Sequence, residues 1–330
     1  MDVRDMITIL DHPVVSGLLV MCLIGLLVYK IGFVDISGLI SAFIIGFTTW
    51  YTGGAAAFVL LLFFFVSAGI ATKFKYKSKA KQGLAQESKG KRSWRNVFAS
   101  GIIPMLFSIG MWLTGFAPWG AQYSAFGTDV IASGTSTIPY WMFGGFIGAV
   151  ATTTADTLAS EIGVFSKSKP RLITNLRRKV PRGTIGAVSL LGEMAAVGAG
   201  ICLGIIAVIF AVLAPGSIPL NLANLNGLEH LAFIIPLSIL TAFIGCNLDS
   251  LIGALVQNKF VCEICGAVTD KEFHCEYETK YIGGFKRFSN MHVNLGSSGM
   301  GSTLGVLLGA GLFVWILGGI FFWILASSNN

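Results

Sequence analysis

The chain has 330 residues, of which 54% are hydrophobic and 12% charged, and its formal net charge is +7. A soluble domain carries about 25% charged residues, so this composition excludes an ordinary soluble protein and predicts an integral membrane protein with a single domain, residues 1–330. The basic residues gather between apolar runs, a distribution typical of membrane topology and not of nucleic-acid binding.

Apolar runs of about 17–25 residues are long enough to cross a bilayer as helices. Such runs predict an all-α, polytopic bundle of about eight transmembrane helices at residues 13–30, 35–52, 54–72, 97–115, 138–162, 183–213, 229–257 and 303–326. The sixth and seventh runs are long, so we expect a break or a tilt in each. Asp2, Asp5 and Asp11 precede the first run, unlike the basic start of a secretory leader.

Basic segments follow the first, third, fifth and seventh runs. Residues 73–95 hold nine Lys or Arg and one acid, residues 167–182 hold seven and no acid, and residues 259–287 hold five with five acids. All of these segments fall on one side, which the positive-inside rule makes cytoplasmic. The pattern therefore predicts a multi-pass protein of the cell membrane with both termini outside, whose basic loops also attract anionic membrane lipids.

Three acidic residues lie inside predicted spans: Asp156, Glu193 and Asp249. Each lies ten or eleven residues from a basic residue of the adjoining loop, about 15 Å along a helix, so the three carboxylates share one level. An ionised side chain in hydrocarbon costs at least about 2.5–3.5 kcal/mol, and three at one level repel one another. We expect them to share Mg²⁺, which prefers oxygen ligands and bridges to substrate phosphates. Separate acids, each paired with a nearby hydroxyl or lysine, are the alternative.

Polar residues near these acids favour a wet cavity. The stretch NMHVNLGSSGMGS at 290–302 contributes Asn290, Asn294 and Ser297, whose side chains can hydrogen-bond phosphate oxygens. Its small residues are equally consistent with close helix packing. A metal beneath two cationic loops suggests a polyphosphate substrate, and phosphoryl transfer needs mainly positioning and charge neutralisation.

The predicted cytoplasmic loop 258–290 contains the stretch CEICGAVTDKEFHC. Cys262, Cys265, Cys275 and either His274 or His292 have a spacing typical of a tetrahedral zinc site. A structural Zn²⁺ would brace the loop. Reduced, unligated thiols are the alternative, and a disulfide is disfavoured in a reducing cytoplasm.

Six stretches stand out as a set: KGKRSWRNVFASG at 89–101, ADTLASEIG at 155–163, PRLIT at 170–174, VPRGTIGAVS at 180–189, LDSLIGALVQ at 248–257 and NMHVNLGSSGMGS at 290–302. Together they resemble one family of integral membrane proteins, which includes plant plastid phytyl-phosphate kinase, animal transmembrane protein 19 and many bacterial and archaeal relatives. The resemblance covers roughly residues 70–310. The chain departs from the family pattern at Ser100, where we expect asparagine, and at Ala187, where we expect glycine.

The resemblance implies a CTP-dependent kinase that phosphorylates an isoprenyl monophosphate of phytyl or geranylgeranyl type, with CTP and the isoprenoid lipid phosphate as partners. Motif matching implies functional positions at Asp156, Glu161, Arg171, Thr174, Arg182, Thr184, Asp249, Asn290 and Asn294. Asp156, Glu193, Asp249 and Glu161 are the expected catalytic acids. Arg171, Arg182 and cations of the 73–95 segment, such as Lys73 and Arg92, would hold the nucleotide.

Glu161 lies five residues after Asp156, so on a regular helix the two side chains point about 140° apart. They can share a metal only if the helix ends or unwinds near Ser160. Otherwise Glu161 is expected to meet a cation such as Arg171 or Arg182.

Other functions fit part of the pattern. A kinase of the free isoprenoid alcohol would use one carboxylate as a base, and a cytidylyltransferase making a CDP-lipid would share the metal site. An ion-coupled transporter also needs buried acids, but it needs polar residues that reach both faces, whereas these acids keep to one level.

Overall fold

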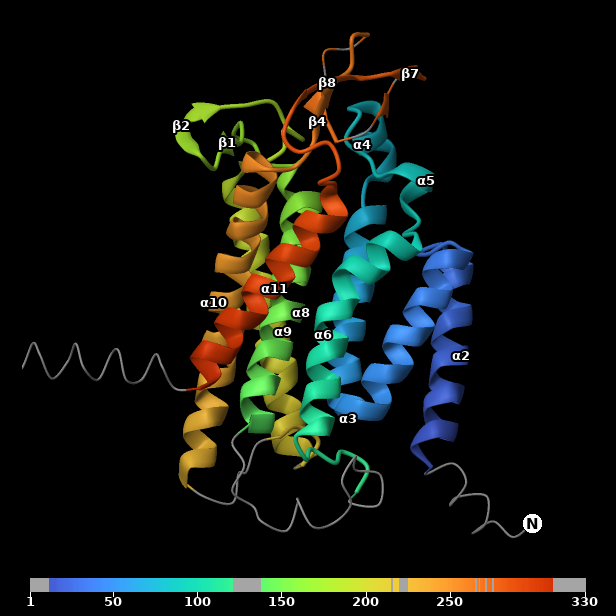
Figure 1. Ribbon diagram of the computed structural model, residues 1–330, viewed down its shortest axis with the longest axis vertical. Helices are drawn as coiled ribbons and strands as arrows, with labels where there is room; N and C mark the ends of the chain where they lie inside the picture. Colours follow the sequence, from blue (N-terminus) through green and yellow to red (C-terminus); the bar gives the residue numbers. More distant parts are fainter. Residues whose placement is uncertain are drawn as a thin grey trace, which may run out of the picture.

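The computed structural model describes residues 12–120, 138–214, 216–219, 225–264, 266, 268–270, 272–274 and 276–310. The chain is mostly helical (Figure 1). Within these residues, five helices are long and apolar enough to cross a membrane: Pro13–Ile31, Ile36–Lys73, Trp94–Leu113, Leu190–Leu213 and Phe233–Leu255. The predicted class, a polytopic helical membrane protein, is confirmed.

The helices follow one another as α2 (Pro13–Ile31), α3 (Ile36–Lys73), α4 (Tyr76–Lys81), α5 (Glu87–Gly90), α6 (Trp94–Leu113), α8 (Ile138–Gly163), α9 (Leu190–Leu213), α10 (Leu225–Leu255) and α11 (Asn290–Gly309). Between α8 and α9 lie β1 (Arg171–Leu172), β2 (Asn175–Lys179) and β3 (Ala187–Val188), an antiparallel sheet in the order β2-β1-β3. Between α10 and α11 lie β4 (Lys259–Val261), β5 (Val268–Thr269), β6 (Phe273–His274), β7 (Tyr277–Glu278) and β8 (Lys280–Gly283). Here β5-β4-β8 form one sheet, and β6 pairs with β7.

Helix α3 is folded back on itself at Gly54, whose φ of 77° and ψ of −178° are not helical. A straight helix of this length would extend about 57 Å, yet a Cβ added at Gly69 would clash with the ring of Phe33, just before α3 begins. Trp50 and Phe58 also pack across the fold, with ring centroids 5.5 Å apart. We call residues 36–53 and 55–73 the two arms of α3. The boundary predicted between runs 35–52 and 54–72 therefore falls at a real break in the helix.

Helix α8 lies at the centre of the bundle and packs against α3, α6, α9, α10 and α11. It approaches α11 closely, because a Cβ added at Gly148 would clash with the carbonyl oxygen of Gly301. Hydroxyl groups in this interior bond to helix carbonyls: Thr154 Oγ1 donates to Val150 O at 2.6 Å, and Thr152 Oγ1 donates across to Thr241 O at 3.0 Å. Small residues and satisfied hydroxyls are how helices associate in a membrane.

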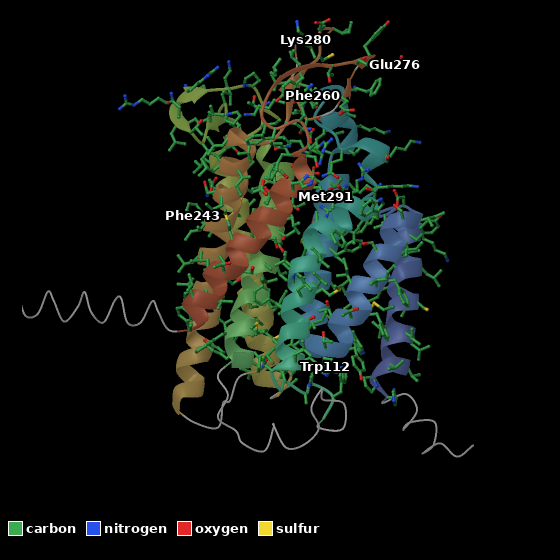
Figure 2. The ribbon with its side chains drawn as sticks, viewed as in Figure 1. Trp112, Phe243, Phe260, Glu276, Lys280 and Met291 are labelled. Carbon is green, nitrogen blue, oxygen red and sulfur yellow. The ribbon has the colours of Figure 1, made fainter. Side chains whose placement is uncertain are left out.

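The connections that follow α2, α3, α8 and α10 lie at one end of the bundle, which we call the basic end (Figure 1, top). Arg92 N–H donates to Phe33 O at 2.9 Å, which joins the connection after α5 to the one after α2. Figure 2 places Phe260, Glu276 and Lys280 beyond the helices at this end, and Trp112 at the opposite end. The predicted gathering of the basic segments on one side is thus borne out by the fold, and the assignment of that side to the cytoplasm stays a prediction.

The strands were not part of the predicted all-α fold, and they shift one predicted boundary. Run 183–213 was predicted as one long span with a break or a tilt, but α9 begins only at Leu190 and the residues before it form β3 and turns. Gly183 and Gly186 adopt φ of 79° and 73° there, which a helix does not permit. The described part of the last predicted span, 303–326, lies in α11, which begins earlier at Asn290, and residues 311–330 lie outside the described residues.

Candidate functional site at the basic end

Two of the predicted acids meet inside the bundle. Asp156 on α8 and Asp249 on α10 have carboxyl groups within hydrogen-bonding reach of each other. Ser297 on α11 donates its hydroxyl to Asp249 Oδ2 at 2.7 Å. Asp249 is buried and Asp156 is partly exposed. We call these two residues the aspartate pair. Three helices that are distant in sequence build it, and two carboxylates this close repel each other unless a proton or a cation lies between them.

Arg92 is the cation that faces this pair from the segment between α5 and α6. It is only 5% exposed, and its guanidinium carbon lies 5.5 Å from the centroid of the Phe64 ring. Burial lowers the pKa of Arg92 to about 10, while attraction to Glu161 and Asp156 acts in the opposite direction. The guanidinium is therefore charged at neutral pH. Its Nε makes no hydrogen bond within the described part of the chain.

Glu161, near the end of α8, has a different environment. Its Oε2 forms an ion pair with Lys79 Nζ at 2.5 Å. Its Oε1 accepts hydrogen bonds from Thr72 Oγ1 at 3.0 Å and from Gln86 Nε2 at 2.7 Å. Lys79 is 1% exposed and donates as well to Ala71 O at 2.9 Å. Helix α8 continues past Ser160 to Gly163, so the unwinding that would bring Glu161 to a shared metal does not occur. The cation that meets it is Lys79, and not Arg171 or Arg182.

Glu193 does not join the aspartate pair in a cluster of described residues close enough to hold a metal ion. Because α9 begins at Leu190, Glu193 occupies the first turn of this helix, and counted along the helices it is shallower than either aspartate. Its Oε2 accepts a hydrogen bond from Asn247 Nδ2 at 2.9 Å. The matched depth expected from the sequence assumed a helix that starts at residue 183. Its role as a third metal ligand stays a prediction.

Within the described residues, no group of three or more His, Cys, Asp or Glu side chains lies close enough to hold a metal ion. The aspartate pair nevertheless has the donor set that Mg²⁺ uses, since this ion is commonly bound by one or two carboxylates, with waters and substrate phosphates as the other ligands. Two facing carboxyl groups with one hydroxyl partner, Ser297, fit such an ion.

The predicted phosphate-binding residues occupy the surface of the basic end. Arg171 is exposed and donates to Leu176 O at 2.6 Å, and Arg182 is exposed and donates to Ser166 O at 2.7 Å. Thr184 Oγ1 donates to Pro181 O at 2.8 Å, whereas Thr174 is exposed in the turn between β1 and β2. These hydrogen bonds go to backbone carbonyls, so the charges of both arginines remain available to an anion.

The remaining predicted polar residues lie on either side of this surface. Lys73 Nζ, at the end of α3, donates to Lys89 O at 2.9 Å. Asn290 is exposed at the start of α11, and Asn294 lies one turn further along. The Oδ1 atoms of Asn294 and of the buried Asn258 make no hydrogen bond in the part of the chain that is described. Buried polar atoms without a hydrogen-bond partner favour the presence of a ligand or water nearby.

The predicted zinc site cannot be followed through the described residues. Cys262 is buried immediately after β4, but Cys265, Cys275 and the side chain of His274 lie outside them. His292 caps its own helix, because its Nδ1 accepts a hydrogen bond from Ser289 N–H at 3.2 Å. The zinc site stays a prediction.

The sequence did not single out Lys79 or Gln86 as partners of Glu161. Lys79 is one of nine cations between residues 73 and 95, and no local pattern distinguishes it from the others. Lys79 is buried because α4 packs against the end of α8, which is a tertiary contact.

The fold and the site are those of a polytopic helical membrane protein with buried acids beneath its basic end. The chain belongs to the family described as integral membrane protein DUF92, whose model matches residues 19–302. This confirms the resemblance seen in the six sequence stretches.

Three relatives illustrate the similarity. Protein PGR of Arabidopsis thaliana is 32% identical over 258 residues, which cover 78% of this chain and 83% of the relative. Uncharacterized membrane protein MJ0933 of Methanocaldococcus jannaschii is 27% identical over 88% of this chain and 92% of its own length. Protein VTE6, chloroplastic, of Arabidopsis thaliana is 34% identical over 48% of this chain and 42% of its length. No solved structure matches the chain.

Proposed function

We propose that the protein is a CTP-dependent kinase that converts an isoprenyl monophosphate of phytyl or geranylgeranyl type to the diphosphate at the cytoplasmic face of the cell membrane. The observation that carries the proposal is the aspartate pair beside a buried, charged arginine. Similarity to Protein VTE6 and membership of the family support an isoprenoid-related membrane enzyme. The preference for CTP rests on the family resemblance alone.

The proposed reaction needs few groups from the protein. An oxygen of the prenyl phosphate forms a bond to the terminal phosphorus of CTP, the bond from that phosphorus to the bridging oxygen breaks, and CDP leaves. The acceptor oxygen is already anionic, so no strong general base is required. Asp156 and Asp249 would hold Mg²⁺, and Ser297 fixes the orientation of the Asp249 carboxylate. When bound, this ion would neutralise charge on the transferred phosphoryl group.

The surface cations of the basic end would hold the nucleotide. Arg171 and Arg182 both keep unused guanidinium donors while they bond to backbone carbonyls. Charge-assisted hydrogen bonds from arginine to phosphate are stronger than neutral ones. The triphosphate would then lie between these arginines and the aspartate pair, with its terminal phosphate innermost.

Product analysis with the purified, full-length protein tests the proposal. The protein is incubated with labelled CTP, Mg²⁺ and a panel of prenyl monophosphates and prenyl alcohols. We expect CDP and prenyl diphosphate from a monophosphate. Prenyl monophosphate formed from an alcohol would indicate an alcohol kinase, and inorganic diphosphate with a CMP-linked lipid would indicate a cytidylyltransferase. No nucleotide turnover by folded protein with any acceptor would contradict all three activities and favour a transporter.

A further inference from the structure

An apolar groove of about 680 Å³, its open mouth included, runs between α2, both arms of α3 and α6. Its walls include Met21, Leu39, Ala42, Phe58, Leu61 and Val97. Among the described residues that line it, Arg92 is the only charged one. The groove is therefore an apolar channel with a single cation at its basic end.

Small residues keep this groove open. A Cβ added at Gly46 would lie 3.0 Å from Met21 Sδ, and one added at Gly101 would lie 2.9 Å from Ile45 Cγ2. Larger side chains at these positions would therefore push neighbouring residues into the space. Mostly apolar walls with a few polar groups are typical of small-molecule sites.

The groove lies at the edge of the bundle, where lipid can reach it. Helix α2 forms its outer wall and packs mainly against α3 (Figure 1). The opposite face of α2 is exposed, with Leu23 at 72% and Leu26 at 61%. A molecule that enters between α2 and α3 would come from the hydrocarbon of the membrane, and not from water.

Arg92 gives the groove a preferred occupant. The residue is 95% buried, and its Nε has no hydrogen-bond partner within the described part of the chain. A buried donor left unsatisfied is costly, and more so when it is charged. Asp156 and Glu161 attract Arg92, and neither of these acids lines the groove. Arg92 thus stands between an apolar channel and the aspartate pair, where an anionic head with an apolar tail would complete its hydrogen bonds.

We propose that this groove binds the tail of the acceptor, a single-chain isoprenoid monophosphate, and that Arg92 binds its phosphate next to the aspartate pair. The inference rests on the proposed function and moves Arg92 from the nucleotide to the acceptor. From Val28 to Met21 the groove follows α2 for about 10 Å, so it encloses the part of a long tail nearest the phosphate and leaves the rest in lipid. The burial of Arg92 favours a compact phosphate over a glycerophospholipid head, which carries a second chain at the same level.

The first test maps where an acceptor binds. A photoreactive prenyl monophosphate is crosslinked to the full-length protein in vesicles, and the labelled peptides are identified by mass spectrometry. We expect labelling on α2 and α3, with competition by unlabelled prenyl monophosphate and little competition by phosphatidic acid. Ala42→Trp, which fills the groove, should reduce this labelling about tenfold or more. Ile44→Trp is the matched control, because Ile44 lies on the same arm and is 56% exposed.

The second test concerns the phosphate. Arg92→Met should raise the KM for prenyl monophosphate at least about tenfold, the loss of one charge-assisted hydrogen bond, while the KM for CTP stays within about twofold. Arg92→Lys should recover part of the difference, because it keeps the charge. A thermal melt of each variant checks folding, and Ala42→Trp tests the groove independently if Arg92 variants do not fold.

The outcomes separate this inference from the kinase proposal. Turnover by the wild type with labelling only on helices other than α2, α3 and α6 would overturn the groove and leave the kinase in place. Equal competition by phosphatidic acid would overturn the choice of a single-chain acceptor. No turnover with any acceptor would overturn the kinase, and the labelling would then decide by itself whether the groove binds a prenyl phosphate.

Discussion

Two acidic environments lie five residues apart on α8 and differ in almost every respect. Both Glu161 oxygens are occupied: Lys79 bonds one, and Thr72 and Gln86 bond the other. Asp156 instead faces the acidic Asp249, whose side-chain donor is Ser297. The same helix therefore carries one acid in a direct ion pair and one that faces another acid, with Arg92 attracting it but in no ion pair among the described residues.

The difference separates a structural role from a functional one. A buried carboxylate that is paired and fully hydrogen-bonded contributes to a defined fold. Removal of one partner leaves the other charge buried and unpaired. A pair of carboxyl groups at one place is unfavourable until a cation arrives. The comparison predicts that changes around Glu161 affect stability, whereas changes in the aspartate pair affect turnover.

The largest expected effect is the loss of turnover when either residue of the aspartate pair is replaced. Asp156→Asn and Asp249→Asn should each abolish phosphoryl transfer, because the metal loses one of its two carboxylate ligands. Both variants should fold, and without Mg²⁺ their melting temperatures should equal or exceed that of the wild type, since a repulsive buried charge is gone. Labelled-CTP turnover and a thermal melt measure the two properties. Near-normal turnover in both variants would contradict a metal held by this pair.

The next effect is on stability around Glu161. Lys79→Met should lower the free energy of unfolding by about 3–5 kcal/mol, because Glu161 is left buried without its cation. The double variant Lys79→Met with Glu161→Leu removes both charges and should recover most of this loss. Thermal unfolding midpoints of the two variants and the wild type provide the measurement. A double variant no more stable than Lys79→Met would show that the ion pair is not what holds this end of α8.

A smaller effect is expected for the nucleotide. Arg182→Ala should weaken CTP binding by about 1.5–3 kcal/mol if the guanidinium makes a charge-assisted hydrogen bond to a phosphate. Equilibrium binding of labelled CTP measures it. Arg177→Ala is a suitable control, because Arg177 is an exposed arginine of β2, in the same connection between α8 and α9, and lies outside the predicted site. Equal losses in the two variants would mean a general effect of loop charge.

The smallest change is expected at Glu193. It has its own partner in Asn247 and lies in the first turn of α9, so Glu193→Gln should reduce turnover about tenfold or less, roughly 1.4 kcal/mol. Abolished turnover would instead place Glu193 among the metal ligands and restore a site with three carboxylates.

Much of the fold follows from the sequence, because hydropathy and charge report directly on the membrane. The run at 13–30 matches α2 within one residue, and the break between the second and third runs falls at Gly54. The strands could not be predicted in this way, since they are two to five residues long and carry no periodic pattern. The late start of α9 was signalled by Gly183 and Gly186, since glycine disfavours a helix, but hydropathy alone runs across them.

Site residues could be predicted from the sequence where a residue type is unusual for its surroundings, and not where it is common there. An acid inside an apolar span is rare, so Asp156 and Asp249 stand out in the sequence alone. A lysine in a basic loop is ordinary, so Lys79 does not. The meeting of Ser297 with Asp249 depends on how closely α11 packs within the bundle, which is a property of the tertiary structure.

Metal binding by the aspartate pair tests the central claim most directly. Mn²⁺ can stand in for Mg²⁺, and electron paramagnetic resonance reports the free ion as it is titrated with full-length protein and CDP. We predict about one bound Mn²⁺ per chain in the wild type and in the Lys79→Met, Glu161→Leu double variant, and loss of this binding in Asp249→Asn. Unchanged Mn²⁺ binding by folded Asp249→Asn protein would contradict the account.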